Sequence, residues 1–280
     1  MPRRCISALT KAVDTHTMEV VWDGRPRQLR LLDVVPESAF ENSGQSPTEF
    51  GRHIYAWLRD EVLRDIRDVE IETPNEGLIS NSGKLLGHVF VRGENLAVRM
   101  VRPGLSPCFE KYGYPKEHAV ELGDAERWAM REGLGIWGSP AAERYRELKR
   151  WWLLRAGQVE RCRHAMSMGE DILDARLNYD DIIKRASVKA QSVIFADVSG
   201  VFPLSDGAVL IQLGGAFQPL CAYFPPALRA FAMHLAREHL GERKPNYLYF
   251  DCTISLEGEQ PQVVVETTHT VLASPPGIPG

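Results

Sequence analysis

Two acidic residues and a histidine near the N-terminus have the chemistry and spacing of a metal site. Asp14 and His16 are two positions apart, so on a β-strand their side chains point to the same face. Asp33 follows a later predicted strand and offers a further carboxylate. One imidazole with two carboxylates suits Mn²⁺ or Zn²⁺ better than Ca²⁺, which prefers oxygen ligands alone. Asp14, His16 and Asp33 are therefore candidate metal ligands, with the alternative that His16 is inert and binds no metal.

A second group, in the middle of the chain, could bind nucleic acid. Lys149, Arg150 and Trp151 are consecutive, and Trp152 and Arg155 follow closely. Aromatic rings beside cationic side chains form platforms on which the bases of single strands stack. The segment 139–192 carries 11 Lys and Arg against 8 Asp and Glu, whereas the segments on both sides of it are net acidic. We predict Lys149, Arg150 and Trp151 as nucleic-acid contacts; the alternative is that the paired tryptophans pack against a barrel.

Strands and helices in the first half must position the N-terminal group. Residues 7–35 are predicted to form strands, with Asp23-Gly24 as a hairpin turn. After them the pattern predicts a helix that opens at Pro47-Thr48-Glu49, short strands at 69–72 and 85–91, a short helix at 95–101 and a longer helix at 117–132 that Gly133 ends. This order is typical of a five-stranded OB-like barrel with a helix inserted between strands.

In the second half of the chain, the hydrophobic pattern predicts a helical connector followed by further strands. Helical patterns cover 140–168 and 171–189, and period-two patterns cover 193–201, 208–213, 248–255 and 262–266, with a helix that starts at Pro225-Pro226. These strands are compatible with a second OB-like barrel. The predicted class is α+β, mainly β, with a first barrel at 1–138, a basic connector at 139–191, a second barrel at 192–274 and a flexible tail at 275–280.

Short motifs in the first half, taken in order, resemble the staphylococcal nuclease-like (thermonuclease-like) family. Residues 13–17 resemble its V-D-G-D-T motif, and residues 30–37 resemble its R-L-x-G-x-D-x-P-E motif. Residues 95–105 resemble N-x-x-L-V-x-x-G-L/A, and residues 125–137 resemble the final A-E-x-x-A-x-x-x-x-x-G-L/I-W. The resemblance covers roughly residues 7–138 and implies an OB-fold nuclease domain.

The resemblance also implies roles for particular residues. Arg30 corresponds to a phosphate-binding arginine, Glu37 to the glutamate that positions the attacking water, and Lys84 to a second arginine that stabilises the transition state. Tyr112 and Tyr114 fall where the family has tyrosines that line the nucleotide pocket. We therefore expect Arg30, Glu37 and Lys84 to be catalytic if hydrolysis survives, and Tyr112 and Tyr114 to contact nucleic acid.

The sequence departs from the family at its calcium ligands. His16 stands at the position of the principal ligand aspartate, and Val34-Val35 stand where a second aspartate is found, with one residue fewer. Both changes remove a carboxylate, and carboxylates supply most of the binding energy for Ca²⁺. Lysine at position 84 keeps a charge but lacks the bidentate fork of arginine. A weakened calcium site is expected.

The bulk properties fit a soluble protein without a disulfide framework. The five cysteines are scattered and contain no C-x-x-C pair, which argues against a zinc knuckle. No apolar run approaches the roughly 20 residues of a membrane span. We expect a cytoplasmic protein whose partner is nucleic acid and not a membrane.

Three functions follow from these observations. The leading one is a nucleic-acid-associated protein with a degenerate calcium site, which binds single-stranded DNA or RNA with weak or no hydrolysis. The second is an active metal-dependent phosphodiesterase with an altered metal preference. The third is a protein-interaction scaffold, which the net acidic charge of both barrels favours.

Overall fold

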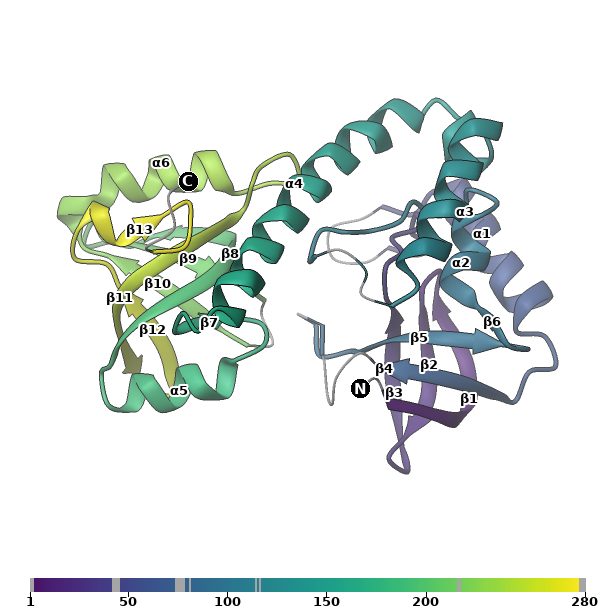
Figure 1. Ribbon diagram of the computed structural model, residues 1–280, viewed down its shortest axis with the longest axis horizontal. Coiled ribbons are helices and arrows are strands. Elements are labelled where there is room, and N and C mark those ends of the chain that lie inside the picture. Colours follow the sequence, from purple (N-terminus) through teal and green to yellow (C-terminus); the bar gives the residue numbers. More distant parts are fainter. Residues whose placement is uncertain are drawn as a thin grey trace. The chain divides into compact units, whose positions relative to one another are not determined.

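The computed structural model describes residues 3–41, 46–73, 79–80, 82–113, 115, 117–215 and 218–276. The chain divides into two compact units. The first comprises Met1–Glu110 and Pro115–Lys149, and the second comprises Lys111–Tyr114 and Arg150–Gly280. Each unit contains one closed β-barrel with helices around it (Figure 1), so the predicted α+β fold with two barrels is confirmed.

The first barrel closes through a parallel pair of strands. Its strands are β1 (Arg3–Asp14), β2 (Thr17–Trp22), β3 (Arg25–Leu31), β4 (Asp68–Thr73) and β5 (Leu85–Val91). Neighbours follow the order β3-β2-β1-β4-β5, and β3 pairs with β5 to close the ring, while β6 (Glu94–Asn95) extends β5 at the edge. Asp23 and Gly24 form the β2–β3 turn with φ of 50° and 74°, the left-handed conformation that a tight hairpin requires.

Three helices cover this barrel. The first is α1 (Glu49–Trp57), which continues as the π-helical segment η1 (Leu58–Val62). The predicted start at Thr48 is confirmed, because its hydroxyl accepts a hydrogen bond from the Gly51 N–H. After β6 come α2 (Leu96–Val101), α3 (Ala119–Glu132) and the 3₁₀ segment η2 (Gly135–Gly138). Helical spacing places Ile54, Leu58 and Val62 in the barrel core.

The second barrel repeats the topology of the first. Its strands are β8 (Gln191–Pro203), β9 (Val209–Leu213), β10 (Leu220–Phe224), β11 (Tyr247–Glu257) and β12 (Gln260–Val264). The ring runs β8-β9-β10-β12-β11, with β10 parallel to β12 and β11 paired with β8. The 3₁₀ segment η3 (Pro226–Leu228) and α6 (Arg229–His239) lie between the third and fourth strands, as α1 does in the first barrel.

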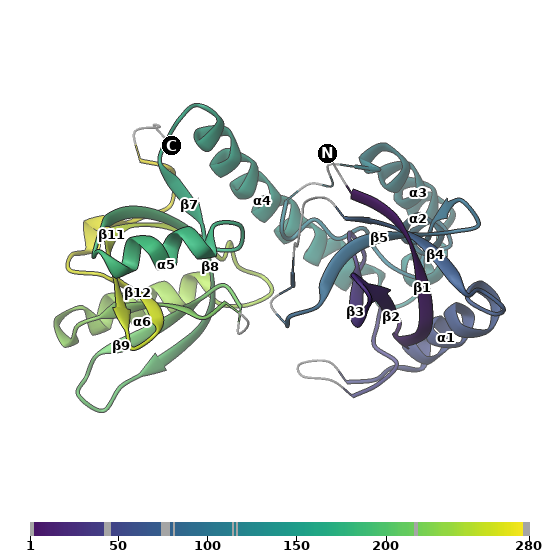
Figure 2. The same cartoon turned by 90° about the horizontal axis from the view of Figure 1, so that it is seen from below.

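Further elements extend the second unit. The helix α4 (Ala142–Ser167) begins in the first unit and ends in the second. Figure 2 shows α5 (Tyr179–Ser187) against the barrel, where it contacts β11 and β12. The remaining short elements are β7 (Ile172–Asp174), η4 (Thr268–Thr270) and β13 (Val271–Leu272). In the part of the chain that the structure describes, no helix has the length and hydropathy to cross a bilayer.

The structure contains strands that the sequence did not predict, among them β7 and β10. The segment 171–189 was expected to be helical, but Ile172–Asp174 forms β7 and pairs in parallel with Val193–Phe195 of β8. A three-residue strand of this kind depends on its distant partner, which local periodicity does not reveal. The strand β10 was not predicted, because its five residues lie between Pro219 and Pro225 and give a short pattern.

Candidate functional site

The turn after β1 holds the first candidate residues. The Oδ1 atom of Asp14 accepts a hydrogen bond from the Thr15 N–H at 2.7 Å. The ring of His16 is buried, with Nδ1 3.3 Å from the Thr15 hydroxyl. Its Nε2 atom has no hydrogen-bond partner in the described part of the chain. The structure therefore presents His16 as a buried imidazole with one unused nitrogen.

Two cations act on this imidazole. Arg30 lies in β3, in register with Thr17 of β2 and Leu86 of β5. Lys84 directly precedes β5. Burial is the main cause that lowers the pKa of His16 well below its usual value, and the charges of Arg30 and Lys84 lower it further. The imidazole is therefore neutral at physiological pH.

Lys84 is held by the turn that precedes β5. Its N–H donates to the Ser80 hydroxyl at 3.0 Å, and its carbonyl accepts from the Ser80 N–H at 2.7 Å. Burial lowers the pKa of Lys84, the Arg30 charge lowers it further, and Asp14 opposes both. The structure thus brings together Asp14, His16, Arg30 and Lys84, four of the residues predicted from the sequence.

Asp33 belongs to a different group. It has a left-handed backbone, with φ of 59°, and its Oδ2 lies 3.4 Å from Nε2 of His88. Burial is the main cause that raises the pKa of Asp33 to about 7, and the Glu110 and Glu117 carboxylates add to it. Among the described residues no three His, Cys, Asp or Glu side chains could hold a metal ion. The predicted set of Asp14, His16 and Asp33 is therefore not assembled in this structure.

The sequence did not point to the group that surrounds Asp33. His88 of β5 is directly opposite Glu72 of β4, and the Glu72 Oε1 is 2.9 Å from Nε2 of His118. The two imidazole rings meet edge to face with centroids 4.9 Å apart. Burial lowers the pKa of His88 to about 4, and His118 contributes to this shift. Strand register places His88 opposite Glu72, and the start of α3 brings His118 to the same group; a search for ligand spacing in the sequence contains neither piece of information.

Glu37 is engaged by two hydroxyl groups. Its Oε2 accepts a hydrogen bond from Thr48 Oγ1 at 2.6 Å, and its Oε1 accepts from the Tyr145 hydroxyl at 3.2 Å. Thr48 is also the N-cap of α1, so the carboxylate connects the loop after β3 to the start of that helix. These contacts give Glu37 a structural role, and its predicted role in activating water stays a prediction.

Lys149 does not present its charge to a ligand. The side chain is buried, and Nζ donates to both Glu110 oxygens at 2.8 and 2.9 Å, to Glu126 Oε2 at 2.6 Å and to the Cys108 carbonyl at 3.2 Å. An ammonium group has three hydrogens, and these acceptors use all of them. We therefore correct the prediction for Lys149: it neutralises two buried carboxylates inside the first unit.

The remaining predicted nucleic-acid contacts lie in the second unit. Arg150 is exposed and Trp151 is half-buried. Arg155 is buried and donates to the carbonyls of Gly241, Glu242 and Lys244 at 2.6–2.8 Å, just beyond the C-terminus of α6. It therefore stabilises the second unit and is not available to a ligand.

Tyr112 also has an observed partner in the second unit. Its ring lies under the Arg176 guanidinium, with the Cζ atom 3.9 Å from the ring centroid. Tyr112 is thus engaged in a cation–π contact within that unit. Tyr114 lies outside the described residues.

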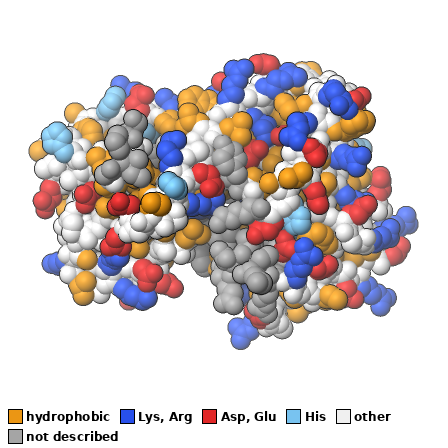
Figure 3. Space-filling model, viewed as in Figure 1, with side chains coloured by type: hydrophobic (Ala, Val, Ile, Leu, Met, Phe, Trp, Pro, Cys, Tyr) orange, Lys and Arg blue, Asp and Glu red, His pale blue; other side chains and the backbone are white. Residues whose placement is uncertain are grey.

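The exposed charges on one face of the molecule are mixed in sign. On the face drawn in Figure 3, Lys and Arg side chains alternate with Asp and Glu side chains, without a continuous basic band. Any anion that binds this face would meet single cations instead of a broad positive field.

Comparison with known families identifies the first barrel. The family model of the staphylococcal nuclease homologue matches residues 28–139. The match starts in β3, and the strands β1 and β2 that complete the barrel precede it. The matched residues include Arg30, Glu37 and Lys84. A match to this family suggests a function related to nucleic acid. The predicted resemblance to the staphylococcal nuclease family is therefore confirmed as a family-model match over residues 28–139.

Proposed function

We propose that the first barrel binds the phosphate groups of single-stranded nucleic acid at Arg30 and Lys84, without a calcium ion. The observation that carries this proposal is the pairing of β3 with β5, which sets Arg30 opposite Leu86, two positions after Lys84, while the neighbouring Leu31 N–H donates to the His16 carbonyl at 2.9 Å. His16 stands where the family has an anionic aspartate, and the cations Arg30 and Lys84 lie nearby. Such a site attracts an anion more than a metal cation. The phosphate of a nucleic acid is the anion that this family suggests.

The residues present do not fit a calcium ion. Ca²⁺ takes six to eight oxygen ligands, mostly from carboxylates. The group around His16 offers the Asp14 carboxylate, whose Oδ1 already accepts from Thr15, together with an imidazole nitrogen and two cations. Asp33 is paired with His88. Calcium-dependent hydrolysis is therefore not expected of this site.

The proposal is tested by measuring oligonucleotide binding against salt concentration. Fluorescence anisotropy of a labelled single strand should show a dissociation constant that rises with salt. Arg30→Ala and Lys84→Ala should each weaken binding and reduce the salt slope by about one. Arg59→Ala is the matched control, because it removes an exposed cation that pairs with Asp60 elsewhere in the same unit. Absence of salt-dependent binding, or an equal loss in the control, would contradict the proposal.

A metal-dependent phosphodiesterase is the second candidate, and one observation favours it. The buried Nε2 of His16 has no partner within the described residues and could serve as a ligand for Mn²⁺ or Zn²⁺. A nuclease assay with a panel of divalent ions separates the two candidates. Cleavage in Mn²⁺ or Zn²⁺ that His16→Ala abolishes would favour the phosphodiesterase, with Arg30→Ala as the control against contaminating nuclease. If no ion supports cleavage, the phosphodiesterase is excluded and nucleic-acid binding without hydrolysis remains as the proposed function.

A further inference from the structure

The first unit contains a pocket on the side of α2 and α3, built from residues other than Arg30, His16 and Lys84. It has a volume of about 730 Å³. A neighbouring cavity of about 380 Å³ shares four of its lining residues, so the two are adjacent. The shared residues are Val98, Arg102, Glu121 and Trp128. Volumes of this order are typical of sites for small organic ligands.

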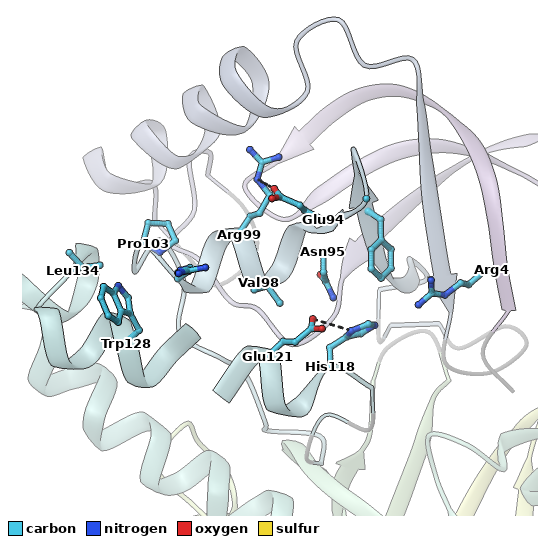
Figure 4. A pocket seen from close by; sticks show the side chains of 13 residues that line it. Arg4, Glu94, Asn95, Val98, Arg99, Pro103, His118, Glu121, Trp128 and Leu134 are labelled. Carbon is cyan, nitrogen blue, oxygen red and sulfur yellow. Dashed lines mark ion pairs between the residues drawn. The ribbon is translucent and has the colours of Figure 1, made fainter. Parts of the chain in front are cut away.

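Figure 4 shows the ends of this pocket. Trp128 lies at one end beside Pro103 and Leu134, and Arg4 lies at the other. The Trp128 side chain is 44% exposed, although it is one of the largest apolar side chains in the unit. Arg131 covers part of the ring, with Cζ 4.7 Å from the ring centroid. The indole thus offers a flat aromatic surface to anything that enters the pocket.

The cations of the pocket differ in how far their charge is already compensated. Arg4 forms ion pairs with Glu70 and Glu72, and Arg99 is 3.4 Å from Glu94. The exposed side chain of Arg102 has no ion pair or hydrogen bond among the residues that the structure describes. Arg102 is therefore the cation of this pocket whose charge is available to an incoming anion.

We propose that this pocket binds one nucleotide unit, with its base on Trp128 and its phosphate on Arg102. The choice of a nucleotide as ligand rests on the proposed function, but the pocket is built from other residues than the site at Arg30 and Lys84. An aromatic surface next to an uncompensated guanidinium is the combination that recognises a base and its phosphate. The Glu94 and Glu121 carboxylates would repel a long polyanion, so a single unit fits better than a continuous strand.

The test follows the indole N–H signals of ¹⁵N-labelled full-length protein by NMR. The chain has six tryptophans, and Trp128→Phe identifies the signal of Trp128. A mononucleotide and a single-stranded trinucleotide should shift this signal, whereas inorganic phosphate should not. The trinucleotide should bind no more tightly than the mononucleotide, because the site holds one nucleotide unit; clearly tighter binding of the trinucleotide would contradict the proposal of a single-nucleotide site.

Variants separate this pocket from the site at Arg30. Trp128→Ala should weaken mononucleotide binding, measured by calorimetry, roughly 5- to 150-fold, which is the range for one lost base stack. Arg102→Ala should weaken it on the order of tenfold. Arg59→Ala should leave binding unchanged, and Arg30→Ala should leave the Trp128 shift intact. Retained amide dispersion confirms that each variant is folded.

Three results would overturn the inference. The first is an unchanged Trp128 signal with every nucleotide. The second is a shift that Arg30→Ala abolishes, since the response would then come from the other site. The third is a Trp128 signal that responds to an acidic peptide and not to nucleotides, which would identify a protein partner instead. If oligonucleotide binding is lost in Arg30→Ala but the mononucleotide still shifts Trp128, both proposals stand independently.

Discussion

Replacing Lys149 by methionine tests the correction that the structure makes to the sequence analysis. Lys149 is the cation between Glu110 and Glu126, and all three residues are at most 8% exposed. Methionine fills a similar volume but leaves two carboxylates buried without a cation. Breaking a buried ion pair by removing one partner typically costs about 3–5 kcal/mol of unfolding free energy. We expect Lys149→Met to destabilise the first unit by an amount in this range at neutral pH.

The loss should depend on pH. Burial already raises the pKa of Glu126, and Lys149 is the main influence that opposes this. Without the cation, the folded state holds a proton that the unfolded chain releases above the ordinary glutamate pKa of about 4.3. Stability then falls as the pH rises, because the folded state binds more protons than the unfolded one. The cost of Lys149→Met should therefore be small near pH 4 and largest at neutral pH.

Urea unfolding across this pH range, combined with hydrogen exchange of the β1–β5 amides, measures the effect in the first unit. Arg150→Met is the matched control, since it removes the neighbouring exposed cation and should change stability by less than about 0.5 kcal/mol. A loss below about 1 kcal/mol for Lys149→Met, together with weaker oligonucleotide binding, would refute the structural role and restore Lys149 as a nucleic-acid contact.

Four further changes probe the polar groups of both units. Asp33→Asn should make stability rise more steeply with pH between about 4 and 7, because the raised pKa of Asp33 makes the folded state keep a proton that the unfolded chain loses. His88→Gln should have the opposite effect between about 4 and 6.5, since burial lowers the pKa of His88 and the folded state loses this proton before the unfolded chain does. Urea unfolding against pH checks both variants, and parallel pH profiles would contradict the opposite directions of the two pKa shifts. Arg155→Met should destabilise the second unit by roughly 2–3 kcal/mol in thermal unfolding, because three carbonyls lose their donor, and a loss below about 1 kcal/mol would show that water replaces it. Thr48→Val should cost about 1 kcal/mol as a lost helix cap, measured by urea unfolding, whereas an unchanged midpoint would mean that Glu37 and the loop hold α1 without it.

Much of the first barrel could be predicted because its signals are local. The Asp23-Gly24 turn, the Thr48 cap and the Gly133 stop each act through the conformation of a few adjacent residues. The second barrel was predicted less completely. Its strand β10 and the short β7 are stabilised by pairing with distant strands, so their own residues carry a weak pattern.

The candidate site shows the same division. Arg30 and Lys84 were found by their place in motifs, and the structure brings them to His16. Asp33 was expected beside His16 because it is close in sequence to the position where the family has its second aspartate. Its left-handed backbone and its contact with His88 instead place it in another group, and neither follows from spacing. Lys149 and Arg155 were predicted to lie beside a base-stacking platform because they are close to the paired tryptophans, whereas the groups that accept their hydrogen bonds lie 23 to 89 positions away.

The position of Lys149 has a practical consequence for anyone who wishes to produce the nuclease-like domain alone. The family match ends at residue 139, but the cation that neutralises Glu110 and Glu126 comes ten positions later, inside α4. A polypeptide cut at the end of the match would carry two facing carboxylates in its interior and no counterion for them. The stretch of chain that folds is longer than the stretch that sequence comparison recognises, so a stable domain should be cut after residue 149.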